Sequence, residues 1–225
     1  IPPLVRLGEC LLEQCDIGLA LEKYDAALQI TVLHSQRWTS LLKPSTGSIR
    51  PDARVREVPW ASNTRGPQMG TYNDEWPIEL GSNEILLESI AAQGISGKMV
   101  AIDALEILRC QAIALRRRYQ LLGPLAKHNP LSTPLLNAFS TNFGGQSESI
   151  QTAANICRAL AAIGTGDRVA SAKLLFQNLS VSNGLDHPLT AIALLALADL
   201  ALDSNELGLA QERATEATIV AGRTG

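Results

Sequence analysis

The sequence predicts an all-α protein, a right-handed solenoid of antiparallel helical hairpins interrupted by one long irregular segment. First, apolar residues recur three and four positions apart over most of the 225 residues. Second, hydrophobic residues make up 46% of the chain but aromatic residues only 4%. Such an Ala-, Leu- and Ile-rich composition suits closely packed helices better than a sheet. Third, short breaker segments separate the periodic stretches, so neighbouring helices are expected to run antiparallel.

The periodic stretches place the helices. We expect them at residues 4–14, 18–33, 83–93, 98–122, 148–163, 168–180, 188–203 and 206–221, and residues 132–140 are a candidate for a shorter one. In the stretch 98–122, apolar residues from Met99 to Leu115 fall three or four positions apart. Asp103, Glu106 and Arg109 gather on the opposite side as a favourable ladder of charges. We expect no sheet of more than two short strands.

Residues 44–81 break the helical pattern. They contain five prolines and four glycines without helical periodicity. They also contain Trp60 and Trp76, which a disordered linker would not usually carry. We therefore expect an ordered irregular insertion, anchored on the helices by these two tryptophans. Residues 1–43 form an N-terminal hairpin and residues 82–225 a hairpin array, together one continuous domain.

A spacing of small residues occurs twice, 190 positions apart. The stretch "LVRLGECLLEQCDIGLALEKYDAALQ" has Leu7-Gly8 in one helix, then Ala20, Tyr24 and Ala27 in the next. The second copy consists of Leu194, Leu197, Ala198 and Ala201, followed by Ala210, Ala214 and Ala217. A third candidate consists of Ile156, Ala159, Leu160 and Ile163, followed by Ala172, Phe176 and Leu179. It fits less well, because Leu160 stands where the small residue of the first helix belongs.

This spacing resembles the tetratricopeptide repeat, a helical hairpin of about 34 residues. The sequence departs from the family at Leu4, where Trp is common, and at Val32, where Pro is common. The resemblance covers about half the chain in three pieces. It implies a curved stack of hairpins in which small residues let paired helices approach closely. A generic α-solenoid or an irregular helical bundle is the alternative.

Two acid pairs occupy matching places in the two copies. Glu9 and Glu13 lie on the first helix of one copy, and Asp199 and Asp203 hold the equivalent positions in the other. In tetratricopeptide proteins, residues at these places line the concave groove. The resemblance therefore implies a partner-binding surface for a protein or peptide with a basic segment. The alternative is the solvated polar face that any amphipathic helix has.

The run Arg116-Arg117-Arg118 is the strongest basic feature. It is a candidate patch for a phosphate or an acidic partner. The alternative is a solvated helix end, where arginines interact favourably with the helix dipole.

Other chemistry has little support in the sequence, and we expect no catalytic, cofactor or metal site. Gly97-Lys98 precedes Met99, where a phosphate-binding loop needs Ser or Thr. The histidines and the four cysteines lack metal-ligand spacing, and the cysteines are expected to be buried free thiols, which favours a cytoplasmic location weakly. The net charge of −3 argues against a nucleic-acid surface across the chain, and no apolar run is long enough to span a bilayer. Because the chain begins without Met, we interpret it as a piece of a longer protein, and any targeting sequence or anchor would lie outside this piece.

These observations favour a non-catalytic module that presents a helical groove to a peptide or a neighbouring domain. One alternative is a scaffold segment that joins other domains or copies of itself. Another is an enzyme or small-molecule binder with a pocket between the helices and residues 44–81. An open groove would favour the interaction module. Exposed apolar faces at the ends of the stack would favour the scaffold segment. A closed pocket with titratable groups would favour the enzyme or small-molecule binder.

Overall fold

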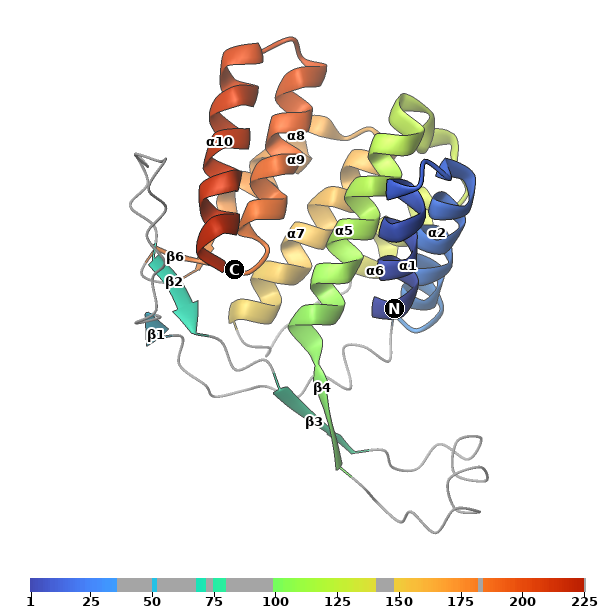
Figure 1. The fold of residues 1–225 in the computed structure, drawn as a ribbon, viewed down its shortest axis with the longest axis vertical. Coiled ribbons are helices and arrows are strands. Elements are labelled where there is room, and N and C mark those ends of the chain that lie inside the picture. Colours follow the sequence, from blue (N-terminus) through green and yellow to red (C-terminus); the bar gives the residue numbers. More distant parts are fainter. Residues whose placement is uncertain are drawn as a thin grey trace.

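The computed structural model describes residues 1–35, 50–51, 68–71, 75–79, 99–140, 148–181 and 184–224. The described part is mainly helical, which confirms the all-α class (Figure 1). Its helices form successive pairs along the chain: α1 (Pro2–Glu13) with α2 (Ile17–Leu33); α5 (Ala104–Leu122) with the 3-10 helix η1 (Gly123–His128) and α6 (Ser132–Phe139); α7 (Glu148–Thr165) with α8 (Arg168–Gln177); and α9 (Thr190–Asp203) with α10 (Leu207–Thr224).

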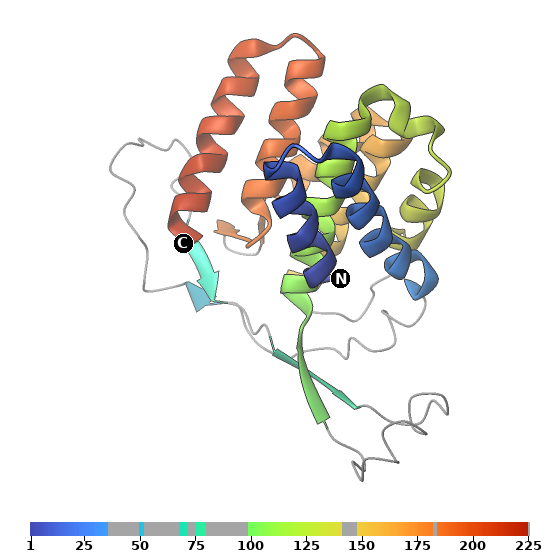
Figure 2. The ribbon, with the colours of Figure 1, turned by 45° about the vertical axis from the view of Figure 1, so that its right-hand side comes forward.

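The hairpins pack in chain order. The second helix of each hairpin contacts the first helix of the next, as α2 does with α5, α6 with α7 and α8 with α9. The first helices also pack side by side, α1 on α5 and α5 on α7. In addition α5 touches α9, two hairpins further along the chain. Helix α5 therefore lies at the centre of the helical body, between the first and last hairpins (Figures 1 and 2).

Three hairpin turns share one backbone geometry. One residue just past the end of the first helix has a positive φ in each, 62° at Cys15, 94° at Gly166 and 62° at Asn205. At the first turn, Cys15 N–H donates to Leu12 C=O and Asp16 N–H donates to Leu11 C=O, both at 2.9 Å. The same two bonds close the other turns, which makes all three Schellman motifs. Sequence analysis found the hairpins but not this shared turn, because Cys is an unusual residue at a positive φ.

The shared turn corrects the register of the third repeat copy. When Gly166 is aligned with Cys15, the counterpart of Gly8 is Ala159 and the counterpart of Ala20 is Ser171. Both counterparts are fully buried. The predicted alignment, with Leu160 and Ala172, was therefore wrong by one residue. A small residue does occupy the hairpin contact, as in the other copies.

Two predicted helices change at their ends because strands adjoin them. Residues 99–103 form β4 (Met99–Asp103), which pairs with β3 (Glu75–Glu79), so α5 begins at residue 104 and not at 98. Asp103 caps α5 by accepting the Glu106 N–H at 2.7 Å. Helix α8 ends at residue 177, because β5 (Ser180–Val181) and β6 (Leu185–Asp186) lie between it and α9.

The prediction of no sheet larger than two strands is wrong. A four-stranded sheet has the order β1 (Arg50–Pro51), β2 (Gln68–Thr71), β6, β5. Its central pairing is parallel and long-range, with Gln68 opposite Leu185 and Met69 opposite Asp186. Strands of two to four residues are too short to show an alternating pattern, so the sequence gives no local signal for this sheet.

The described parts of residues 44–81 lie in two places. Strand β2 joins β6 near the C-terminal end of α10, whereas the β3–β4 ribbon extends away from the helices (Figures 1 and 2). Trp76 pairs through its backbone with Ile102 in that ribbon. Trp60 and the expected helix at 83–93 fall outside the described residues. The anchoring role of Trp60 and Trp76 stays a prediction.

The first hairpin has a close helix contact at Gly8. A Cβ atom on Gly8 would lie 2.6 Å from Cε1 of Tyr24. The Tyr24 ring is fully buried, and its hydroxyl donates to the Glu9 carboxylate, so the ring has little freedom to move away. A side chain at Gly8 would therefore separate α1 from α2.

Gly8→Ala should lower the free energy of unfolding by roughly 1–3 kcal/mol, because it overpacks the contact with Tyr24. Gly18→Ala is the control: a Cβ there meets no atom within 4 Å, so Ala should be neutral or stabilising. Urea unfolding of the two variants measures the difference. Equal midpoints for both variants would contradict the close packing of α1 on α2.

His187 is buried in the connection between α8 and α9. Its Nδ1 accepts the Leu189 N–H at 3.0 Å, so the proton of the neutral ring lies on Nε2, which is 3.4 Å from Ser149 Oγ. This tautomer cannot accept the Ser149 proton, so the pair is not a nucleophile and its base. Burial lowers the pKa of His187 to about 3, against a smaller raising effect of Ser149.

Stability should therefore fall as the pH drops below about 6.5, because the unfolded chain binds a proton at His187 that the folded chain does not. Between pH 7 and pH 5 the loss should be about 2 kcal/mol. His187→Asn keeps an acceptor for Leu189 N–H and should flatten this part of the pH profile. Urea unfolding at both pH values tests the difference, and an equal loss in the variant would exclude His187 as its source.

Candidate functional site

Three consecutive arginines on α5 each contact a different helix. Successive residues of an α-helix point about 100° apart, so Arg116, Arg117 and Arg118 face three directions. We call these residues the arginine row. Arg116 binds Asp199 of α9 through two hydrogen bonds, Nε to Oδ2 at 2.8 Å and Nη2 to Oδ1 at 3.2 Å.

The other two arginines bind the first hairpin. Arg117 donates two hydrogen bonds to Glu9 of α1, from Nε to Oε1 at 3.0 Å and from Nη2 to Oε2 at 3.0 Å. Arg118 is 3% exposed and donates from Nε to Oδ1 of Asp25 on α2 at 2.7 Å. Its Nη1 donates to Ser132 Oγ of α6 at 3.0 Å. The arginine row therefore joins α5 to α1, α2, α6 and α9.

Three of the four acids proposed for partner binding are engaged inside the protein. Glu9 accepts from Arg117 and Tyr24, and Asp199 accepts from Arg116. Burial raises the pKa of Glu9, but the hydrogen bonds from Arg117 and Tyr24 outweigh it and hold the pKa below its usual range. Asp203 accepts from Tyr119 at 2.6 Å and lies 3.1 Å from the Arg168 guanidinium.

The fourth acid, Glu13, is exposed and has no hydrogen bond or ion pair within the described residues. The sequence presents the arginine patch and the acid pairs as separate candidate sites. In the structure Arg116 forms an ion pair with Asp199, and Arg117 forms one with Glu9. Their roles in partner binding stay predictions. Sequence reasoning missed these ion pairs because their partners are far apart in the chain. Arg117 and Glu9, for example, are 108 positions apart, and no local pattern links them.

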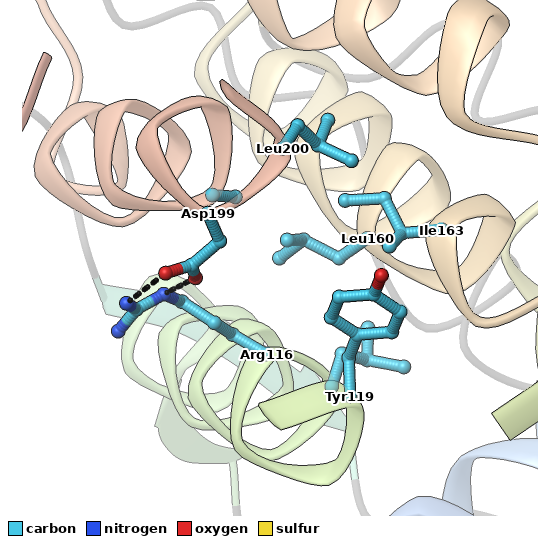
Figure 3. A pocket seen from close by; sticks show the side chains of 8 residues that line it. Arg116, Tyr119, Leu160, Ile163, Asp199 and Leu200 are labelled. Carbon is cyan, nitrogen blue, oxygen red and sulfur yellow. Dashed lines mark hydrogen bonds and ion pairs between the residues drawn. The ribbon is translucent and has the colours of Figure 1, made fainter. Parts of the chain in front are cut away.

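A small pocket lies beside the pair of Arg116 and Asp199 (Figure 3). Its free volume of about 10 Å³ is at the lower limit of what one water molecule needs. Apart from Arg116 and Asp199, the lining residues are Leu115, Tyr119, Leu160, Ile163, Ala196 and Leu200. The pocket therefore has room for a bound water but not for a substrate.

The cysteines divide into two buried and two exposed residues. Cys110 and Cys157 are buried as expected, whereas the prediction is wrong for Cys10 and Cys15, which are exposed. Cys15 lies in the turn after α1, and Cys10 lies on the exposed side of α1. Burial and the neighbouring Glu106 carboxylate raise the pKa of Cys110 to about 11, so this thiol stays protonated at neutral pH.

A larger groove separates α8 from α10, with α9 as its floor. Its volume is about 310 Å³. The residues that line this α8–α10 groove are Ala172, Phe176, Leu197, Leu200, Ala201, Ser204, Glu206, Leu209 and Arg213. Phe176 is 60% exposed, and the guanidinium carbon of Arg213 lies 5.9 Å from the centre of its ring.

Sequence reasoning missed the α8–α10 groove because of the slipped register. The predicted alignment put Phe176 at the position of the buried Tyr24, inside a hairpin. The Asp167 cap, which accepts the Ala170 N–H at 3.2 Å, fixes the start of α8 and could have corrected the register.

No group of three or more His, Cys, Asp or Glu side chains in the described ranges is arranged to hold a metal ion. Among the helices that the structure describes, none is both long and apolar enough to cross a membrane. Comparisons with protein-family models, curated proteins and solved structures gave no match to this chain.

Replacing Arg118 by Leu should lower the free energy of unfolding by roughly 1–3 kcal/mol, because Asp25 and the buried Ser132 lose the hydrogen bonds that Arg118 donates. Arg6→Leu is the matched control. Arg6 also bridges two helices, 3.0 Å from Glu106, but it is 60% exposed, and such pairs contribute less than about 1 kcal/mol. Chemical denaturation measures both variants. A loss for Arg118→Leu as small as for Arg6→Leu would contradict a structural role for the buried pair.

Proposed function

We propose that the chain is a non-catalytic protein–protein interaction module that presents the α8–α10 groove to a peptide or a neighbouring domain. Its architecture is a right-handed, tetratricopeptide-like solenoid. The shared Schellman turns and the repeated packing of each second helix on the next first helix support this architecture. The observation that carries the function is the open apolar groove with an exposed phenylalanine.

The groove has the composition of a recognition surface. Its floor is aliphatic, and a partly exposed aromatic ring stands at one wall. Exposed apolar surface bordered by polar residues is typical of protein-binding sites, and aromatic side chains contribute strongly to such interfaces. Glu206 and Arg213 place both signs of charge at its edge, which gives a peptide a preferred direction.

The concave side formed by the first helices is less suited to a basic segment than the acid pairs suggest. Glu9 and Asp199 are already neutralised by Arg117 and Arg116. A basic peptide there would have to displace arginines that are fixed to α5, at the expense of contacts between hairpins. This comparison favours the α8–α10 groove over the acids of the concave side.

The test is selection of binders from a random 12-residue peptide display library against the intact 225-residue chain. Selected peptides should share an apolar anchor, and Phe176→Glu should weaken their binding at least tenfold in fluorescence polarisation. Leu125→Glu is the control, because Leu125 is 70% exposed in η1, outside the groove. Failure to select any peptide, or equal binding to Phe176→Glu and to the unaltered protein, would overturn the proposed function.

A further inference from the structure

The α8–α10 groove is bounded by two successive hairpins of the array. Its walls are the second helices of these hairpins, and its floor is the first helix of the later one. In the described array, each second helix packs on the first helix that follows it, as α8 does on α9. A further hairpin would therefore pack on the side of α10 away from α8, and it would leave the groove open.

The equivalent place between the first two hairpins is closed. Over α5, the second helices α2 and α6 pack on each other. Over α9, in contrast, α8 and α10 leave a groove of about 310 Å³. Phe176 on one wall is 60% exposed and Leu209 on the other is 39% exposed. The groove thus leaves apolar side chains uncovered that a helix–helix contact would bury, as is typical of a surface that binds a partner.

The cation that lines the groove already has acidic partners. Arg213 Nη1 lies 3.0 Å from Glu216 Oε2 and 3.8 Å from Glu212 Oε1. The guanidinium carbon of Arg213 also lies 5.9 Å from the centre of the Phe176 ring, which is within the range of a cation–π contact. An acidic ligand at this end of the groove would therefore have to compete with two carboxylates for Arg213.

Glu206, at the start of α10, has no such partner. Its side chain is exposed and has no hydrogen bond or ion pair within the described residues. The nearby Asp203 differs, because it lies 3.1 Å from the Arg168 guanidinium. The position of Glu206 before the first turn of α10 favours a negative charge through the helix dipole. This effect leaves both carboxylate oxygens available to a ligand.

The α10 side of the groove therefore carries a net negative charge. Arg213 is outnumbered by its partners Glu212 and Glu216, and Glu206 adds a third carboxylate. Lys173 of α8 is exposed but does not line the groove. A positively charged ligand is complementary to this arrangement, and an acidic one is repelled.

The unpaired carboxylate and the aromatic ring are a short peptide's length apart. Seven positions separate Glu206 from Arg213, which corresponds to about 10 Å along the axis of α10. Since Arg213 lies over the Phe176 ring, the carboxylate and the ring are at opposite ends of this distance. About three residues of extended chain or two turns of helix cover 10 Å. One short segment can therefore contact both.

We propose that the ligand of the α8–α10 groove is a peptide segment with an apolar anchor and a basic residue. The apolar side chain lies on the aliphatic floor beside Phe176, and a Lys or Arg side chain about 10 Å away pairs with Glu206. This partner assignment rests on the proposed function and adds the charge of the partner to it. Because exposed ion pairs contribute little, the apolar contacts supply most of the affinity, while the charge excludes acidic segments.

The probes are two 12-residue peptide display libraries that differ only in charge. In one library Lys and Arg are the only charged residues, and in the other Asp and Glu are. Selection against the intact 225-residue chain should enrich binders from the basic library only. The tightest binder is then labelled with fluorescein for anisotropy titrations.

Glu206→Lys should weaken the binding of this peptide at least fivefold, because repulsion replaces attraction. A peptide in which one Lys or Arg is replaced by Glu should restore the binding, which also shows that the variant is folded. Glu13→Lys is the matched control. Glu13 is likewise exposed and without an ion pair in the described part of the chain, but it lies at the end of α1. The control changes the net charge equally and should leave binding unchanged.

Two results would overturn the partner assignment and leave the proposed function standing. One is selection of binders from the acidic library that require Phe176. The other is a basic peptide that requires Phe176 but binds Glu206→Lys as tightly as the unaltered protein, or is weakened equally by Glu13→Lys. If neither library yields a binder that requires Phe176, the proposed function fails and the partner assignment fails with it.

Discussion

The arrangement of the hairpins depends on the arginine row of α5. Nearest-neighbour packing alone would leave the first and last hairpins independent of each other, as in an open solenoid. Here Arg117 and Arg118 bind the first hairpin while Arg116 binds Asp199 of the last. Because the three guanidinium groups belong to adjacent residues of one rigid helix, both hairpins are positioned relative to the same short stretch. The bidentate geometry of the bonds from Arg116 and Arg117 fixes orientation as well as distance, which a lysine could not do.

The two ends of the helical stack have opposite character. The outward side of α10 is polar, whereas α1 and α2 expose Leu7 and Leu19. The proposed binding surface, the α8–α10 groove, lies near the α10 end. A rigid centre suits such a module, because a binding surface that is already ordered loses less conformational entropy when the partner binds.

The features that could be predicted from the sequence are those that leave a local pattern in it, namely the helices and the hairpins. Apolar periodicity located the ends of the described α-helices to within about three residues, except for the start of α5, and the small-residue spacing located the first and last hairpins. Long-range contacts left no such pattern. The pairing of β2 with β6 and the bond between Arg117 and Glu9 join residues that are far apart in the chain. The slip of one residue in the third hairpin has a physical cause as well: Ala159 beside Leu160 and Ser171 beside Ala172 make two registers fit almost equally well. The turn at Gly166 and the Asp167 cap of α8 distinguish them.

Native-state hydrogen exchange tests the central claim, that the arginine row couples the first and last hairpins through α5. Amides of α1 and α9 should open with a free energy close to that of α5 in the unaltered protein. Arg117→Gln should reduce protection mainly in α1, and Arg116→Gln mainly in α9. If both variants left the protection of α1 and α9 unchanged, the hairpins would be held by nearest-neighbour packing alone, and the claim would be wrong.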